Sequence, residues 1–246
     1  MSSSKTNIKL GQIQFGDIII DVEQKDIKNI HLSVYPPSGA VRIAAPLRLD
    51  MDTIRVYALS KLSWIRRQQE KFRGQVRETP REYLNRESHF FRGKRYLLKV
   101  IESNGIPRIE LKHKTMVMYT KVETTMAKRQ IIIDEWYRAQ LKTLIPPLIE
   151  KWEKILNVEV NEFGIRRMKT KWGTCNAEEK RIWINLELAK KPPNCLEYIV
   201  VHEMVHLLER KHNNIFIAYM DKFLPKWKSY KDELNQLPVR HEQWKY

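Results

Sequence analysis

The feature that most constrains this chain is a pair of histidines four residues apart, His202 and His206, which enclose Glu203 in the pattern H-E-x-x-H. The pattern lies in an apolar run, Glu197–His206, of the kind that forms a buried helix. Residues i and i+4 lie one turn apart on the same helix face, so both imidazoles can reach one metal ion. The spacing therefore predicts a helix that carries two metal ligands on one face.

Zinc suits this pattern, because Zn²⁺ binds imidazole nitrogen at about 2.0–2.1 Å in a tetrahedral site. Glu203 adjoins the first ligand and can reach a water on the ion without binding the ion itself. The ion lowers the pKa of that water toward ~7, and the carboxylate accepts its proton. The alternative is a charged helix with two exposed histidines. Val200, Val201, Met204 and Val205 argue against it, since they predict a buried helix in which unpaired charges are costly.

A catalytic zinc ion takes three protein ligands and keeps one open position. His212, six residues after His206, is the first candidate if the helix ends near Arg210 and Lys211 and the chain turns back. Asn213 favours such a turn as the cap of a following helix. A surface histidine in a basic loop is the alternative interpretation of His212. Three other residues are candidates for the third ligand: Glu209, Asp221 and His241.

Hydrophobic periodicity predicts an α+β fold in which strands precede helices. A first helix is expected over 52–72, capped by Asp50 or Asp52. A second runs from about Thr124 to Leu156, where the pair Pro146-Pro147 predicts a break or kink. Strands are expected as two short runs within 8–21, separated by a turn at Gly16-Asp17, and at 31–35, 41–43, 88–91, 96–101, 109–111 and 116–119. Turn residues such as those at 36–39 separate them. After a β-like stretch over 158–188, helices are expected over 194–206, 213–224 and up to 234. The best boundary lies near Glu123, where strands give way to helices.

The net charge of +16 favours anionic partners such as nucleic acid, acidic proteins or anionic lipid, although simple solubility explains it equally well. A basic cluster, Arg166, Arg167, Lys169 and Lys171, suits DNA phosphates or an acidic substrate, or else a solvated strand face. Two cysteines make no disulfide framework in a chain of this length. No signal peptide opens the sequence, and no apolar run approaches the ~18 residues of a membrane span. A soluble, cytoplasmic protein that does not bind membranes is expected.

Four segments resemble the YgjP-like, SprT-related family of predicted metal-dependent hydrolases, which are minimal zincin metallopeptidases. The segments 168–175, 182–188, 198–206 and 212–216 match the family's W-G-S-C, I-x-L-N-x-x-L and H-E-x-x-H-x5-H-x3-F patterns in order. Upstream, Val41-Arg42-Ile43-Ala44-Ala45-Pro46 and Trp64-Ile65 also fit, so the resemblance covers nearly the whole chain. Thr174 stands where the family usually has Ser, and Met204 where it usually has Leu. Neither change removes a reactive group.

The resemblance implies a zincin-like C-terminal half, 124–246, which contains the H-E-x-x-H helix, and a β-rich N-terminal half, 1–123. It implies that His212 is the third ligand of Zn²⁺, beside His202 and His206. With Glu203 as the general base, the expected function is a zinc-dependent metallopeptidase that acts on a peptide or protein. The alternative is a basic DNA-associated protein whose zinc site is structural or recruits proteolysis to DNA. No helix-turn-helix or zinc-finger pattern supports it, and a structural site has no use for Glu203.

Four further residues are candidates for substrate binding or support of the site. Trp172 and Gly173 can form a strand edge that binds extended peptide, although Trp172 is equally suited to the core. Asn185 can hydrogen-bond a ligand histidine or merely end its strand. Tyr219 can donate to an oxyanion, although helix packing is its plainer role. Cys175 is expected to be a small buried thiol rather than a ligand.

Overall fold

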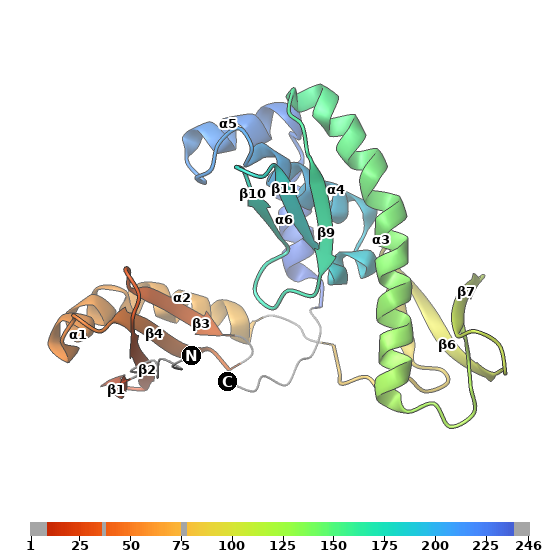
Figure 1. Ribbon diagram of the computed structural model, residues 1–246, viewed down its shortest axis with the longest axis horizontal. Coiled ribbons are helices and arrows are strands. Elements are labelled where there is room, and N and C mark those ends of the chain that lie inside the picture. Colours follow the sequence, from red (N-terminus) through yellow and green to blue (C-terminus); the bar gives the residue numbers. More distant parts are fainter. Residues whose placement is uncertain (1–8, 36–37, 75–77, 239–246) are drawn as a thin grey trace, which may run out of the picture. The chain divides into compact units, whose positions relative to one another are not determined.

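The computed structural model describes residues 9–35, 38–74 and 78–238, and it has the mixed α+β fold that the sequence predicts. The chain forms two compact units, residues 1–75 and 76–246 (Figure 1). The expected boundary near Glu123 falls between a strand and a helix inside the second unit. Each unit has its own hydrophobic core.

The first unit is a four-stranded sheet packed against two helices. Its strands are β1 (Lys9–Phe15), β2 (Ile18–Lys25), β3 (His31–Tyr35) and β4 (Ala40–Pro46), in the order β1-β2-β4-β3. Its helices are α1 (Met51–Ser60) and α2 (Leu62–Arg73), which replace the single helix expected over 52–72. Ile18, Ile20 and Val22 alternate with exposed positions along β2 and pack toward Ile54 and Ile65 of the helices. Asp50 caps α1, as one of the two expected capping residues, because its carboxylate accepts from the backbone N–H of Thr53.

The second unit begins with another four-stranded sheet. Its strands are β5 (Ser88–Phe91), β6 (Lys94–Glu102), β7 (Arg108–Lys112) and β8 (Thr115–Thr120), in the order β5-β6-β8-β7. The turn between β5 and β6 contacts a 3₁₀ turn at Leu186–Lys190. There the N–H groups of Arg92 and Gly93 donate to the carbonyls of Ala189 and Lys190 at 2.9 and 3.0 Å. This sheet is thereby tied to the part of the chain that carries the H-E-x-x-H motif.

A single long helix, α3 (Met126–Leu156), follows and packs against both β7 and a later strand, β9 (Glu162–Arg166) (Figure 1). Of the break or kink expected at Pro146 and Pro147, the break does not occur, because α3 continues through both residues. The two prolines remove two backbone N–H donors. Buried side chains on both sides of them, Leu141, Ile145 and Ile149, hold the helix in one piece against the core.

The motif lies in a second layer of three strands and three helices. The strands are β9 (Glu162–Arg166), β10 (Gly173–Asn176) and β11 (Arg181–Asn185), in the order β10-β11-β9. The helices are α4 (Pro193–Val205), α5 (Asn214–Phe223) and α6 (Trp227–Gln236). α4 packs against α3, α5, α6, β10 and β11, and therefore lies at the centre of the unit. β10 pairs with β11 alone among the described strands and is an edge strand.

Both cysteines are free thiols, Cys175 half-buried and Cys195 buried in the core around α4. The two cysteines do not form a disulfide bond. Among the described helices, none combines the length and the apolar character needed to cross a lipid bilayer.

Candidate active site

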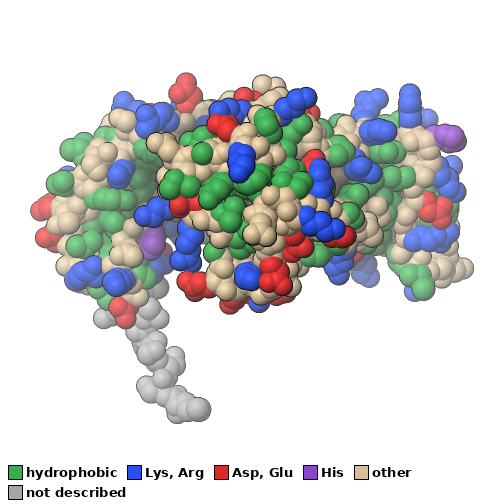
Figure 2. Space-filling view, turned by 90° about the horizontal axis from the view of Figure 1, so that it is seen from above, with side chains coloured by type: hydrophobic (Ala, Val, Ile, Leu, Met, Phe, Trp, Pro, Cys, Tyr) green, Lys and Arg blue, Asp and Glu red, His purple; other side chains and the backbone are tan. Residues whose placement is uncertain are grey.

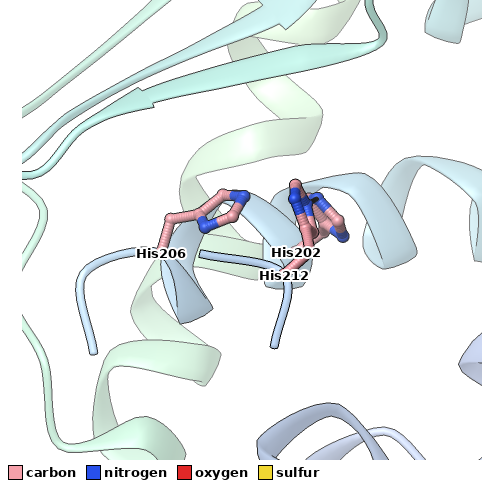
Figure 3. A group of neighbouring side chains, drawn as sticks. All are labelled: His202, His206 and His212. Carbon is pink, nitrogen blue, oxygen red and sulfur yellow. Dashed lines mark hydrogen bonds between the residues drawn. The ribbon is translucent and has the colours of Figure 1, made fainter. Parts of the chain in front are cut away.

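Helix α4 presents the first two histidines as the spacing predicts. Val200, Val201, Met204 and Val205 are fully buried, which fixes the rotation of the helix about its axis. His202 and His206 consequently project together on the side of α4 that faces β10 and α6 (Figure 3). α4 ends at Val205, and His206 is its C-cap. The helix therefore has the bounds expected from the sequence, 194–206, to within one residue, and it ends before Arg210 and Lys211.

The third histidine returns to the first two through a short, hydrogen-bonded loop. The Glu209 carboxylate accepts from the backbone N–H of Lys211 at 2.9 Å. The Asn213 side chain accepts from the N–H of Phe216 at 3.0 Å, so Asn213 caps α5 as expected. Between these two interactions His212 turns back until its Nε2 lies 2.9 Å from Nε2 of His202. Figure 3 shows the resulting group of three imidazoles.

One aromatic ring supports all three imidazoles. The Phe216 ring centroid lies 4.9 Å from that of His202, 4.7 Å from that of His206 and 4.8 Å from that of His212. Phe216 is only 2% exposed. It therefore forms an apolar base that holds the imidazoles in place, because side chains in such a packed interior have few alternative rotamers.

The three imidazoles are in the neutral form that metal binding requires. Burial, together with the nearby His206 and His212, lowers the pKa of His202 to about 3. Burial also lowers the pKa of His206 and of His212. The Nδ1 of His206 lies 3.1 Å from the Glu209 carbonyl, which can only accept a hydrogen bond. His206 therefore carries its proton on Nδ1, and the lone pair of Nε2 is free to bind a metal.

The donor set fits a zinc ion. The three ligand atoms all lie within 4.8 Å of one another. Two nitrogens on a tetrahedral zinc ion are about 3.3 Å apart, so small adjustments bring all three to one ion. Nδ1 of His202 is buried and has no hydrogen-bond partner among the described residues, so packing alone orients this ring. The site thus combines three neutral nitrogen donors with an apolar base, the Phe216 ring.

The alternative third ligands are placed elsewhere. Asp221 accepts from the Trp227 indole N–H at 2.7 Å and pairs with Lys228 at 3.1 Å. Glu209 is engaged with the loop backbone, as described above. His241 lies outside the described residues. Of the candidates that the structure describes, His212 alone joins the histidine pair.

Glu203 is a buried carboxyl group beside the imidazoles. Its side chain is 4% exposed, and burial raises its pKa to about 8, against the opposing charge of Lys171. Gly173 at the start of β10 lies directly against it. A Cβ atom at residue 173 would lie 2.5 Å from Oε1 and 2.7 Å from Cγ of Glu203. The backbone of β10 therefore approaches the carboxyl group more closely than any other residue type would permit.

We expect Gly173→Ala to reduce turnover roughly 10²-fold or more, because the new methyl group displaces the Glu203 carboxyl, and misplacement by about 1 Å is enough for such a loss. The three imidazoles lie away from the clash, so bound metal should stay constant. The comparison variant is Gly105→Ala, whose Cβ would meet nothing closer than 3.5 Å in an exposed loop. Equal turnover of the two variants would show that the close approach is irrelevant.

The imidazoles open into a cleft of about 590 Å³ between β10, α4 and α6. As predicted, Trp172 and Gly173 line it. The other predicted substrate residues do not line it. Tyr219 of α5 stacks on Phe223 instead, with ring centroids 6.1 Å apart. Asn185 is buried, and its amide donates to the carbonyls of Met168 and Lys171 at 2.9 and 2.8 Å. Asn185 therefore fixes the loop that leads into β10 and does not contact a ligand histidine.

Sequence patterns did not single out three residues that line the cleft, Tyr198, Arg210 and Lys231. Tyr198 lies four residues before His202, and this i, i+4 spacing was the available signal. Lys231 of α6 and Arg210 also line the cleft, and no local pattern marks them. Lys171 is a third cation in the lining. Glu203 is the only acidic side chain among the described residues that line the cleft.

The basic cluster at residues 166–171 does not form one free cationic face. Arg167 pairs with Asp134 of α3, and Arg166 stacks on the Trp183 ring, 4.8 Å from its centroid. Lys171 belongs to the cleft. Figure 2 shows Lys and Arg side chains scattered over the visible face, with Asp and Glu between them. Binding of nucleic acid stays a prediction from net charge alone.

A protein-family model and a solved structure are similar to this chain. Residues 28–237 match the model of the YgjP-like family, described as a metallopeptidase domain. Among solved structures, the metallopeptidase zymogen of Pyrococcus abyssi abylysin is 21% identical, with a TM-score of 0.35; the match covers 37% of this chain and 90% of that one. No curated protein matches the chain. The family match spans most of the sequence and confirms the resemblance, and the chain accordingly belongs to the YgjP-like family of metallopeptidase domains.

Proposed function

We propose that this protein is a zinc-dependent peptidase in which His202, His206 and His212 bind the metal and Glu203 is the general base. The observation that carries the proposal is the buried Glu203 carboxyl beside three neutral imidazoles in one cleft. A metal site that only stabilises the fold needs four closed ligands and gains nothing from a buried carboxyl that does not bind the ion. A hydrolytic site needs both an open position and a base.

A zinc ion held by the three histidines supplies Lewis acidity to water and to the scissile carbonyl. Glu203 ionises more readily beside a cation, because an opposite charge favours the charged form. Its carboxylate accepts one proton as the water oxygen bonds to the carbonyl carbon. Glu203 then returns that proton to the amide nitrogen, and the C–N bond breaks. The products are a carboxylic acid and an amine, which exchange the second proton of the water to give a carboxylate and an ammonium group, and Glu203 ends in its starting state.

Peptide substrates are favoured by the edge strand that lines the cleft. β10 hydrogen-bonds to β11 on one side, and its residues Gly173–Asn176 face the cleft on the other. An extended peptide can add to such an edge through main-chain hydrogen bonds, which serve any sequence. The scissile bond then lies near Glu203, because Gly173 touches that carboxyl group. Strand addition therefore positions the substrate at the base.

The proposal is tested by metal analysis together with a peptide digest. We expect protein purified without added metal to contain about one zinc ion per chain, since three imidazoles plus one open position form a catalytic site. It should cleave members of a proteome-derived peptide library, as followed by mass spectrometry. Removal of the metal with a chelator should stop cleavage, and zinc should restore it. Zinc binding without cleavage of any peptide would refute the peptidase and favour a structural metal.

A further inference from the structure

Tyr198 is a buried tyrosine at the floor of the cleft. It lies one helical turn before His202 on α4 and is 5% exposed. Its ring stacks on Trp227 of α6, with centroids 6.4 Å apart and an interplanar angle of 17°. On its other side it meets the His202 ring edge-on at 5.8 Å. Packing from two elements therefore fixes the direction of the side chain.

The hydroxyl of Tyr198 has no partner for its hydrogen bond among the described residues, and yet Tyr198 lines the cleft. A buried phenol almost always finds a hydrogen-bond partner, since an unsatisfied hydroxyl costs about 1–3 kcal/mol. Tyr137, another buried tyrosine of this unit, follows the rule and donates to the carbonyl of Phe90 at 2.6 Å. The hydroxyl of Tyr198 is not among the buried atoms that lack a partner, so it is open to the cleft, where a molecule from outside the chain can accept its hydrogen bond.

We propose that Tyr198 is a catalytic residue that donates its O–H hydrogen bond to the scissile carbonyl oxygen as negative charge develops there. The inference rests on the proposed peptidase function and adds a residue to it. When water bonds to the carbonyl carbon, the carbonyl π-electron pair moves onto oxygen. Tyr198 stabilises that charge and keeps its proton, while the proton of the water goes to Glu203. No further reactant is needed.

Three observations favour Tyr198 over the cationic donors of the cleft. Lys171, Arg210 and Lys231 are exposed, and Arg210 is already paired with Glu178 at 3.0 Å. The attraction of an exposed cation weakens in salt, whereas the hydrogen bond of a neutral hydroxyl does not. The Tyr198 ring is held rigidly, and a donor that is oriented in advance stabilises a transition state without reorganisation.

The test is Tyr198→Phe, which removes the hydroxyl and keeps the ring against Trp227 and His202. We expect kcat to fall roughly 10²–10³-fold, as for the loss of one oxyanion donor, with KM nearly unchanged. Affinity for a peptide phosphinate, which mimics the charged tetrahedral state, should fall by a similar factor, while affinity for a neutral product peptide should not. Zinc content and melting temperature verify the fold. Tyr230→Phe, on α6 and outside the cleft lining, is the matched control.

Each outcome decides the proposal. A fall in kcat that persists at high salt supports Tyr198 as the donor. A Tyr198→Phe variant within about twofold of the parent in kcat overturns it and leaves the peptidase function standing. A loss that appears in KM alone also overturns it, because uniform binding does not accelerate the reaction. If the parent cleaves no peptide, the proposed function fails and this inference fails with it.

Discussion

Glu203→Gln is expected to lower peptide hydrolysis roughly 10²–10⁴-fold, the usual loss when a general base is removed, while the metal content stays the same. Glutamine has the same shape as glutamate and fits against Gly173, where no larger group can be accommodated. Its amide cannot accept the proton of water. The measurement is kcat on a peptide that the parent cleaves, together with zinc content. Glu150→Gln, an exposed change on α3, is the control.

A stability measurement separates this chemical effect from damage to the fold. In the folded, metal-free protein burial raises the pKa of Glu203 to about 8, whereas the unfolded chain has the ordinary value near 4.5. Between these values the unfolded chain has lost the proton and the folded chain has kept it, so stability falls as pH rises. Glutamine removes this penalty. Metal-free Glu203→Gln should therefore melt at or above the melting temperature of the parent at about pH 8. In the separate activity measurement, equal peptide hydrolysis by the variant and the parent would exclude Glu203 as the base.

The sequence predicts the reactive part of the site well, because that part is encoded locally. His202 and His206 share a helix face by spacing alone, and the apolar residues between them determine which face is buried. Asn213 marks the start of α5, and the turn that returns His212 follows from it. The mixed fold and most strands also follow from local patterns, since alternation and turn residues are short-range signals.

The rest of the site depends on contacts between segments that are distant in the sequence. Gly173 touches Glu203 across thirty residues, and Phe216 supports three imidazoles from another helix. Asn185 was expected beside a ligand histidine, yet it holds a loop of the neighbouring strand. Its true partners are backbone carbonyls, which no residue pattern reveals. The proline pair does not break α3 for a related reason, since tertiary packing there outweighs local propensity.

The same contacts between distant segments favour the proposed set of three histidine ligands. The Phe216 ring and the buried residues of α4 hold the imidazoles in place, and the Glu209 carbonyl fixes the tautomer of His206. The ligands are therefore positioned before any metal arrives. A site arranged in this way loses little conformational entropy on binding, which strengthens the affinity of the three nitrogens for an ion.

His202→Ala combined with His206→Ala is accordingly expected to abolish both zinc binding and hydrolysis. One remaining imidazole cannot hold the ion at the affinity that three neutral nitrogens provide, and a zinc ion without its ligands supplies no Lewis acid to the cleft. The measurement is zinc per chain after dialysis against a weak chelator, beside turnover on the same peptide. Loss of metal should leave the fold largely intact, because the two side chains face the cleft and the apolar side of α4 is unchanged. His113→Ala, an exposed change in the turn before β8, is the matched control and should retain metal and activity. Zinc at the parental level in the double variant would refute the ligand assignment and require another set of donors.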